Sequence, residues 1–170
     1  MRLPAAFILA YPLCAAAPAL AAEHPLASFF PGTNTCYSRI YDKNHLVRHP
    51  KQRVVGVQIV HPFFAATSSE AVDYRMAISF RLKGTRDKFG PISTYCQAIA
   101  DGTAKCSVEA DGGRFTLSRG ANNTLVITID RLQLEGQNDF SPDLGHGGDD
   151  RVLVLQKSPM KACPDNKGKE

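Results

Sequence analysis

Apolar and polar residues alternate along several segments of the chain, which is the period of a β-strand buried on one face only. The alternation is clearest over residues 74–83 and recurs over 53–60, 113–119 and 124–135. The apolar series predicted to face the interior consists of Tyr74, Met76, Ile78, Phe80, Leu82, Val55, Val57, Ile59, Phe115, Leu117, Leu125 and Ile127. Since these side chains are large, we expect them to fill the space between the strands.

Turn-forming pairs such as Lys83-Gly84, Asp101-Gly102 and Glu135-Gly136 separate the alternating segments. About eight strands are predicted, at 36–41, 53–60, 73–83, 91–99, 104–110, 113–119, 124–135 (with a bend near Asp130) and 151–157. Helix signals are confined to a turn or two at 25–30 and at 68–72. The pattern predicts an all-β fold, an antiparallel up-and-down β-barrel of about eight strands, with a two-sheet β-sandwich as the alternative.

Residues 1–22 have the features of a cleaved signal peptide. Arg2 is followed by an apolar stretch that closes on Ala19-Leu20-Ala21, the small-x-small pattern that precedes cleavage. Prolines interrupt the stretch, so we do not expect a transmembrane anchor. The sequence therefore predicts a periplasmic or secreted protein with one barrel domain over 23–164 and a polar tail over 165–170.

The cysteines indicate two disulfides. Removal of the leader takes away Cys14 and leaves four cysteines, an even number in an exported chain. Cys96 and Cys106 lie symmetrically about Asp101-Gly102, where a hairpin would place them opposite each other. That leaves Cys36 and Cys163, which would join the start of the first strand to the end of the last. A zinc site is the alternative, although the chain has no Cys-x-x-Cys pair.

Three segments carry a resemblance. Cys36–Tyr41, Glu109–Gly113 and Asp149–Leu155 are similar to segments of uncharacterised exported bacterial β proteins. An eight-stranded meander of this size also resembles the calycin group in architecture, but the Gly-x-Trp signature of lipocalins is absent because the chain has no Trp. The resemblance implies a fold and a compartment and assigns no functional residue.

Charge is distributed unevenly along a chain whose formal net charge is +4. Residues 36–88 contain ten Lys+Arg and four Asp+Glu, whereas residues 89–170 contain nine and eleven. The candidate binding residues lie around the first connection, at Arg39, Lys43, Arg48, Lys51 and Arg53. They are suited to an anionic glycan, a lipid head group or an acidic protein, or they form an ordinary solvated face. Nucleic acid is not expected as a partner in an exported protein, and the oligomeric state is left open.

No catalytic motif for a hydrolase elbow, a zinc protease, a phosphate loop or a dinucleotide site occurs in the sequence. The histidines that could act as bases are His45, His49, His61 and His146, which we interpret as ordinary loop residues. His45 and His49 would share a face only in a helix over 44–50, and Pro50 argues against that helix.

One loop gathers oxygen donors at a spacing similar to a calcium loop. Asp139, Ser141, Asp143 and Asp150 occupy positions 1, 3, 5 and 12 of such a count, but Leu144 stands where the turn requires Gly. We therefore predict no metal and no cofactor, and a solvated connection here.

Three functions remain open. The preferred one is an exported, non-enzymatic binding module that recognises its partner through its outer face or its loops. The second is an interaction protein of the cell envelope that uses the basic half for anionic glycans or lipid head groups. The third is a hydrolase whose site is assembled only in the fold.

Overall fold

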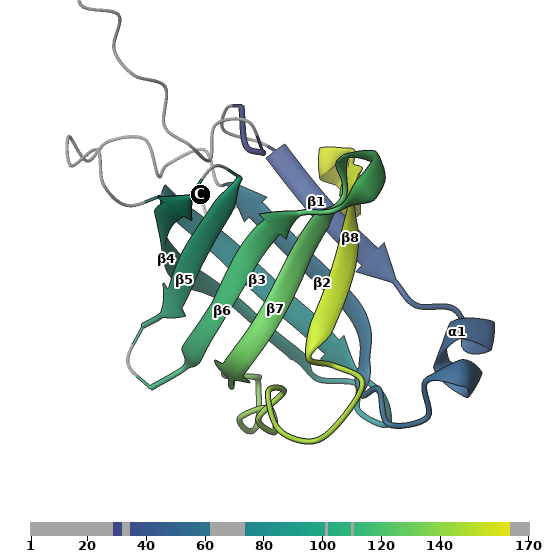
Figure 1. The fold of residues 1–170 in the computed structure, drawn as a ribbon. Coiled ribbons are helices and arrows are strands. Elements are labelled where there is room, and N and C mark those ends of the chain that lie inside the picture. Colours follow the sequence, from purple (N-terminus) through teal and green to yellow (C-terminus); the bar gives the residue numbers. More distant parts are fainter. Residues whose placement is uncertain (1–28, 32–34, 62–73, 101, 110, 164–170) are drawn as a thin grey trace, which may run out of the picture.

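Eight antiparallel strands form a closed barrel in which each strand pairs with the next and β8 returns to β1 (Figure 1). The computed structural model describes residues 29–31, 35–61, 74–100, 102–109 and 111–163. The elements are β1 (Thr35–Ile40), α1 (Lys43–Arg48), β2 (Val54–His61), β3 (Tyr74–Leu82), β4 (Lys88–Ala100), β5 (Thr103–Val108), β6 (Gly113–Arg119), η2 (Ala121–Asn123), β7 (Leu125–Leu132), β8 (Val152–Ser158) and η3 (Met160–Ala162). The predicted all-β barrel is confirmed, and the sandwich alternative is not adopted.

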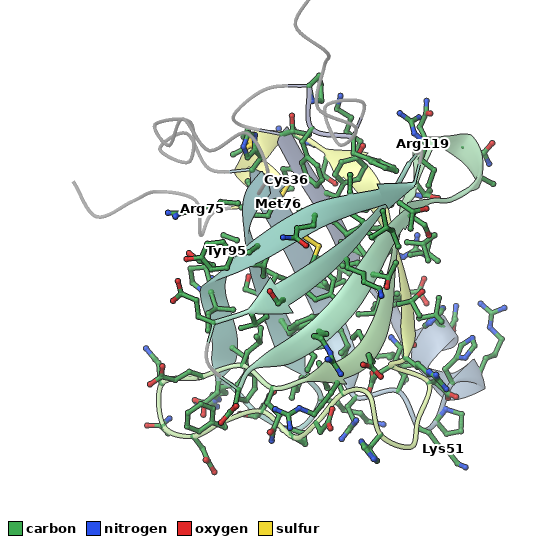
Figure 2. The ribbon with its side chains drawn as sticks, turned by 60° about the vertical axis from the view of Figure 1, so that its left-hand side comes forward. Cys36, Lys51, Arg75, Met76, Tyr95 and Arg119 are labelled. Atoms are coloured by element: carbon green, nitrogen blue, oxygen red, sulfur yellow. A yellow bond between two sulfur atoms is a disulfide. The ribbon has the colours of Figure 1, made fainter. Side chains whose placement is uncertain are left out.

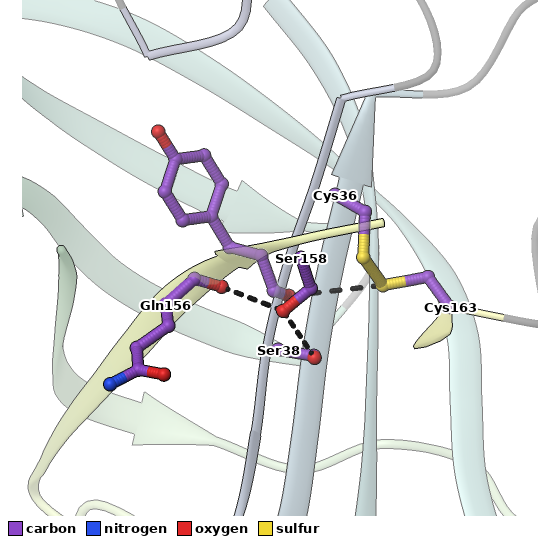
Figure 3. Close-up of a disulfide and its surroundings, with 6 residues drawn as sticks. Cys36, Ser38, Gln156, Ser158 and Cys163 are labelled. Carbon is purple, nitrogen blue, oxygen red and sulfur yellow. Dashed lines mark hydrogen bonds between the residues drawn. A yellow bond between two sulfur atoms is a disulfide. The ribbon is translucent and has the colours of Figure 1, made fainter. Parts of the chain in front are cut away.

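Both predicted disulfides are present. Cys96 and Cys106 are direct partners in the β4–β5 pairing, and their Cα atoms are 4.0 Å apart. Cys36 at the start of β1 is joined to Cys163, which follows η3 (Figure 3). Ser38 Oγ donates a hydrogen bond of 2.9 Å to Ser158 Oγ across the same β1–β8 seam. The covalent link therefore lies where the barrel closes.

The interior is apolar, as the alternation predicts, and it is built largely from the predicted residues. Met76 points into the barrel while its neighbour Arg75 points outward (Figure 2). The other predicted interior residues that are buried are Ile78, Phe80, Leu82, Val57, Ile59, Phe115, Leu117, Leu125 and Ile127. The side chain of Tyr74 lies outside the described set.

Val55 departs from the predicted alternation. A bulge between Val54 and Gly56 in β2 shifts the register, so Val54 is buried and Val55 is only half-buried. The strand β4 begins at Lys88, earlier than predicted. Its pairing with β3 shifts register between Ile78 and Phe80, opposite Gly90 and Pro91. Gly90 has a φ of +87°, a conformation that glycine tolerates. The predicted bend in β7 is confirmed, because its register shifts between Ile129 and Arg131.

Different residues close the two ends of the barrel. At one end Phe29 and Phe30 are buried, and Phe30 makes an edge-to-face contact with Tyr37 at 5.5 Å. At the other end the connection between β7 and β8 buries Leu134 and Leu144. All these side chains belong to one apolar cluster that runs through the barrel. The interior is thus a packed core in the described part of the chain.

The segment after β1 is helical, which corrects the sequence prediction for 44–50. The helix α1 starts at Lys43 because the carboxylate of Asp42 accepts a hydrogen bond of 2.8 Å from the backbone N–H of His45, as an N-cap does. It ends at Arg48, before Pro50, so the proline limits the helix without preventing it.

Other predictions fall outside the described residues. They concern the leader over 1–22, the tail over 165–170, the helical turn at 68–72 and most of the turn at 25–30. In the described ranges, none of the helices has the length and apolar character needed to span a membrane.

Candidate functional site

The predicted basic cluster does not form one site, because Arg53 has a structural role. Its guanidinium Nε lies 2.9 Å from the Oδ2 atom of Asp150, a carboxylate that is fully buried. The backbone N–H groups of Arg53 and Val54 also donate to Asp150, and a second guanidinium nitrogen donates to the carbonyl of Asp143. Arg53 therefore holds the β7–β8 connection against the end of the barrel.

Arg39 is separated from the remaining cations of the cluster. Its guanidinium lies over the ring of Tyr41, 5.6 Å from the centroid, and its Nε is buried without a hydrogen-bond partner in the described chain. Burial raises the pKa of Tyr41, although a hydrogen bond from the backbone N–H of Val154 and the charge of Arg39 act in the opposite direction. Lys43, Arg48 and Lys51 are exposed on and after α1.

The histidines pack in aromatic contacts or pair with carboxylates. The rings of His45 and His49 stack at 4.4 Å, and His45 Nε2 lies 2.9 Å from Gln52 Oε1. His49 lies 4.0 Å from Asp149, and His146 lies 3.0 Å from Asp143. His61 is buried, and its ring lies 6.3 Å from that of Phe30.

The oxygen donors of the loop at 139–150 are directed to backbone groups. Burial alone would raise the pKa of Asp143, but hydrogen bonds from the N–H groups of Gly145 and Leu132 and from His146 lower it below its ordinary value. Ser141 Oγ accepts from the N–H of Leu134, and Asp150 accepts from β2. Within the described residues, no three His, Cys, Asp or Glu side chains group so that they could hold a metal ion.

A groove of 440 Å³ lies on the outer wall of β1, β2 and β3 and is bounded by β4 and η3. We call it the basic groove. It is lined by Ser38, Arg39, Ile40, Gly56, Val57, Gln58, Ser79, Phe80, Arg81, Lys88, Lys161 and Ala162. Among the described lining residues, four are cationic and none is acidic. The nearby carboxylate of Asp87 accepts a hydrogen bond of 2.9 Å from the Asn138 side chain. A groove with this lining attracts anions.

The register of the strands concentrates the positive charge. Gly56 pairs with Arg81 and Arg81 pairs with Lys88, so the three lie in one row across β2, β3 and β4. The guanidinium of Arg81 covers Gly56: a Cβ there would lie 3.0 Å from Arg81 Nε, closer than side chains ordinarily approach. The pKa of Lys88 is lowered by burial and by the charge of Arg81. The fold therefore holds two cations close together on this wall.

The Cys36–Cys163 disulfide places one rim of the basic groove. Cys36, Val60 and Cys163 form a small buried cluster with Ala77 and Met160 on the outside of the barrel. This cluster fixes η3, and with it Lys161, against β1 and β2 (Figure 3).

A second groove, of 680 Å³, lies on the outer wall of β4 to β7. We call it the mixed groove. Arg114 lies 3.3 Å from Asp130 within it, and Tyr95 donates a hydrogen bond of 2.6 Å to Glu109. Arg75 lies over the ring of Tyr95 at 5.1 Å (Figure 2). Most of the charges here are compensated locally.

The basic groove combines Arg39 from the predicted cluster with three cations from other elements. Arg81 and Lys88 belong to the basic half of the sequence, whereas Lys161 lies far from it along the chain. The one feature of the sequence that could have pointed to this groove is the position of Arg81 on the polar, outward face of the alternating segment 74–83. No family model, curated protein or solved structure matches this chain, so the assignment of the site rests on its own geometry.

Proposed function

We propose that the protein is an exported, non-enzymatic binding module that holds an anionic group of its partner in the basic groove. The observation that supports this most strongly is a groove on the outer wall whose described lining holds four cations and no acidic residue. An anion there would offset the mutual repulsion of Arg81 and Lys88.

The packed interior supports recognition from outside. Side chains such as Ile78, Leu117 and Ile127 are fully buried, so the barrel offers its partner an outer surface. Among the residues that the structure describes, the core cluster consists of apolar side chains and holds no pair of acidic or histidine groups for acid–base catalysis, which favours binding over hydrolysis. Two disulfides agree with an oxidising compartment such as the periplasm or the medium, where we place the protein together with the predicted leader.

The second candidate function, contact with anionic glycans or lipid head groups of the envelope, draws on the same groove. The two candidates share the chemistry of the recognised group, which is an anion presented on a larger surface. The basic groove favours this chemistry over an uncharged partner.

The test measures retention of the exported protein on immobilised dextran sulfate as a probe. Arg81→Gln with Lys88→Gln should weaken binding about tenfold and make its salt dependence shallower by about two charges. Lys105→Gln with Lys157→Gln removes the same charge from exposed positions outside the basic groove and should have a much smaller effect. Equal losses in the two variants, or no binding by the wild type, would reject the proposal.

A further inference from the structure

A patch of exposed apolar side chains borders the basic groove at the β1–β8 seam. Ile40 is 71% exposed, Val152 53% and Val154 41%, which is unusual for aliphatic residues on strands. Val126, on β7, is the direct partner of Val154. We call Ile40, Val126, Val152 and Val154 the seam stripe.

The strand register makes the seam stripe continuous with the basic groove. The β1–β8 pairs run from Cys36↔Ser158 to Ser38↔Gln156, and Ile40 and Val154 each lie two residues beyond the last pair on their strands. Ile40 also pairs with Gly56, which in turn pairs with Arg81. Ile40 therefore begins a transverse row of paired residues on the outer wall that passes through Gly56 to Arg81 and Lys88, and the paired valines stand across the seam from β1. Its first half is apolar and its second half is cationic.

We propose that this row binds an anionic lipid at a membrane surface, with the head group in the basic groove and the seam stripe in contact with the acyl region. This inference rests on the proposed function and specifies its ligand. Exposed aliphatic side chains beside cations are the composition by which proteins lie on an anionic membrane. Lys43, Arg48 and Lys51, exposed on the adjoining segment, add to the attraction.

The shape of the surface favours a lipid over an acidic protein segment. Within the seam stripe, only Ile40 also lines the basic groove. The valines lie on the outer wall of a closed barrel, which curves away from a rigid partner. A fluid bilayer adapts to such a wall, while the head group enters the groove.

The direct test uses the absence of Trp from the chain. Ile40→Trp introduces a single fluorescent reporter into the seam stripe, and Ile99→Trp places one at another exposed isoleucine, on β4. Vesicles of phosphatidylcholine with about one third phosphatidylglycerol should shift the emission of the first variant to shorter wavelength and leave that of the second unchanged. Equal shifts, or no shift at Ile40→Trp, would reject the proposal.

Vesicle co-sedimentation separates the apolar from the ionic contribution. Ile40→Ser with Val154→Ser keeps every charge and should weaken binding to the anionic vesicles about tenfold, whereas Ile99→Ser should leave it unchanged. Arg81→Gln with Lys88→Gln should also weaken it, and vesicles of phosphatidylcholine alone should bind little. Binding that survives loss of Ile40 and Val154 would be purely electrostatic and would contradict the role of the seam stripe.

The two proposals fail in different ways. If the wild type binds dextran sulfate through Arg81 and Lys88 but does not bind anionic vesicles, the proposed function stands and the lipid inference is wrong. A glycan or an acidic protein segment is then the partner. If it does not bind dextran sulfate, both proposals are wrong.

Discussion

The basic groove and the mixed groove both lie on the outer wall of the barrel, but they differ in how many of their charged side chains pair with an opposite charge in the groove. In the mixed groove Arg114 has Asp130 at 3.3 Å and Tyr95 donates to Glu109, so its polar groups find partners within the wall. In the basic groove the lining residues that the structure describes include four cations and no acid. The smaller of the two grooves therefore carries the greater excess of charge.

This difference separates a wall on which charges are paired from one on which the described lining residues gather several cations. Exposed ion pairs such as Arg114–Asp130 contribute little to stability and mainly keep the wall neutral. In the basic groove, in contrast, burial and then the charge of Arg81 lower the pKa of Lys88. A fold that maintains such repulsion on a partly buried wall is a candidate for anion recognition.

The largest expected effect is the loss of unfolding free energy when the disulfide beside either groove is removed. Cys36–Cys163 spans 127 positions of the sequence and Cys96–Cys106 spans 10. Loop-closure entropy predicts that replacing the first pair by alanine lowers the free energy of unfolding by about 5 kcal/mol, and replacing the second by about 3 kcal/mol. Urea denaturation measures both. Only the first replacement should also weaken dextran sulfate binding, because it releases the η3 rim; a weakening by both would contradict this role.

The next effect comes from an acid placed in the basic groove. Gln58 lines the basic groove, and Gln58→Glu adds a negative charge to the same lining as its cations. Dextran sulfate binding should weaken about fivefold, with stability unchanged within about 0.5 kcal/mol. Titration calorimetry and urea denaturation give the two numbers. Thr116→Glu in the mixed groove is the control and should change binding less.

The opposite change should make the mixed groove resemble the basic groove. Asp130→Asn removes the partner of Arg114. Because the pair is exposed, stability should change by less than about 1 kcal/mol, while dextran sulfate binding should strengthen about threefold. Unchanged binding would mean that net charge on this wall is not what the anion detects.

The smallest effect concerns pH. Since the pKa of Lys88 is lower in the folded protein than in the unfolded chain, the folded state binds fewer protons between the two values. Stability should therefore rise as the pH increases through that interval, and Lys88→Met should remove the rise. Titration of the lysine side chains by NMR should give Lys88 a midpoint below those of exposed lysines, and added dextran sulfate should move it upward. A midpoint unaffected by the polyanion would place the anion elsewhere.

The local pattern of apolar and polar residues was sufficient to predict the strands, but it did not predict the bulges within them. Alternation identified the inward faces of β3 and β6, because period two is a property of consecutive residues. It misplaced Val55, since a bulge depends on the partner strand as well as on the bulged one. Pro50 suggested that no helix precedes it, whereas the Asp42 cap and the packing of Leu46 on the core allow a short one.

The sequence also indicated that the protein has a basic surface, but it did not show where on the fold that surface lies. Arg53 looked equivalent to Lys51 along the chain, yet only Arg53 pairs with a buried carboxylate, that of Asp150, which lies 97 positions away in sequence. An interaction over this separation depends on which segments the fold brings together.

The amino-acid sequence by itself determined the strand pattern, the disulfide pairing and the excess of positive charge in residues 36–88, because each depends on spacing, parity or composition. The tertiary structure alone decided that Gly56, Arg81, Lys88 and Lys161 meet in one groove and that Ile40 links it to the seam stripe. The physical reason is the register. Closing the barrel fixes which residues of neighbouring strands stand side by side, and a shift of one residue would turn Arg81 from the outer wall toward the core.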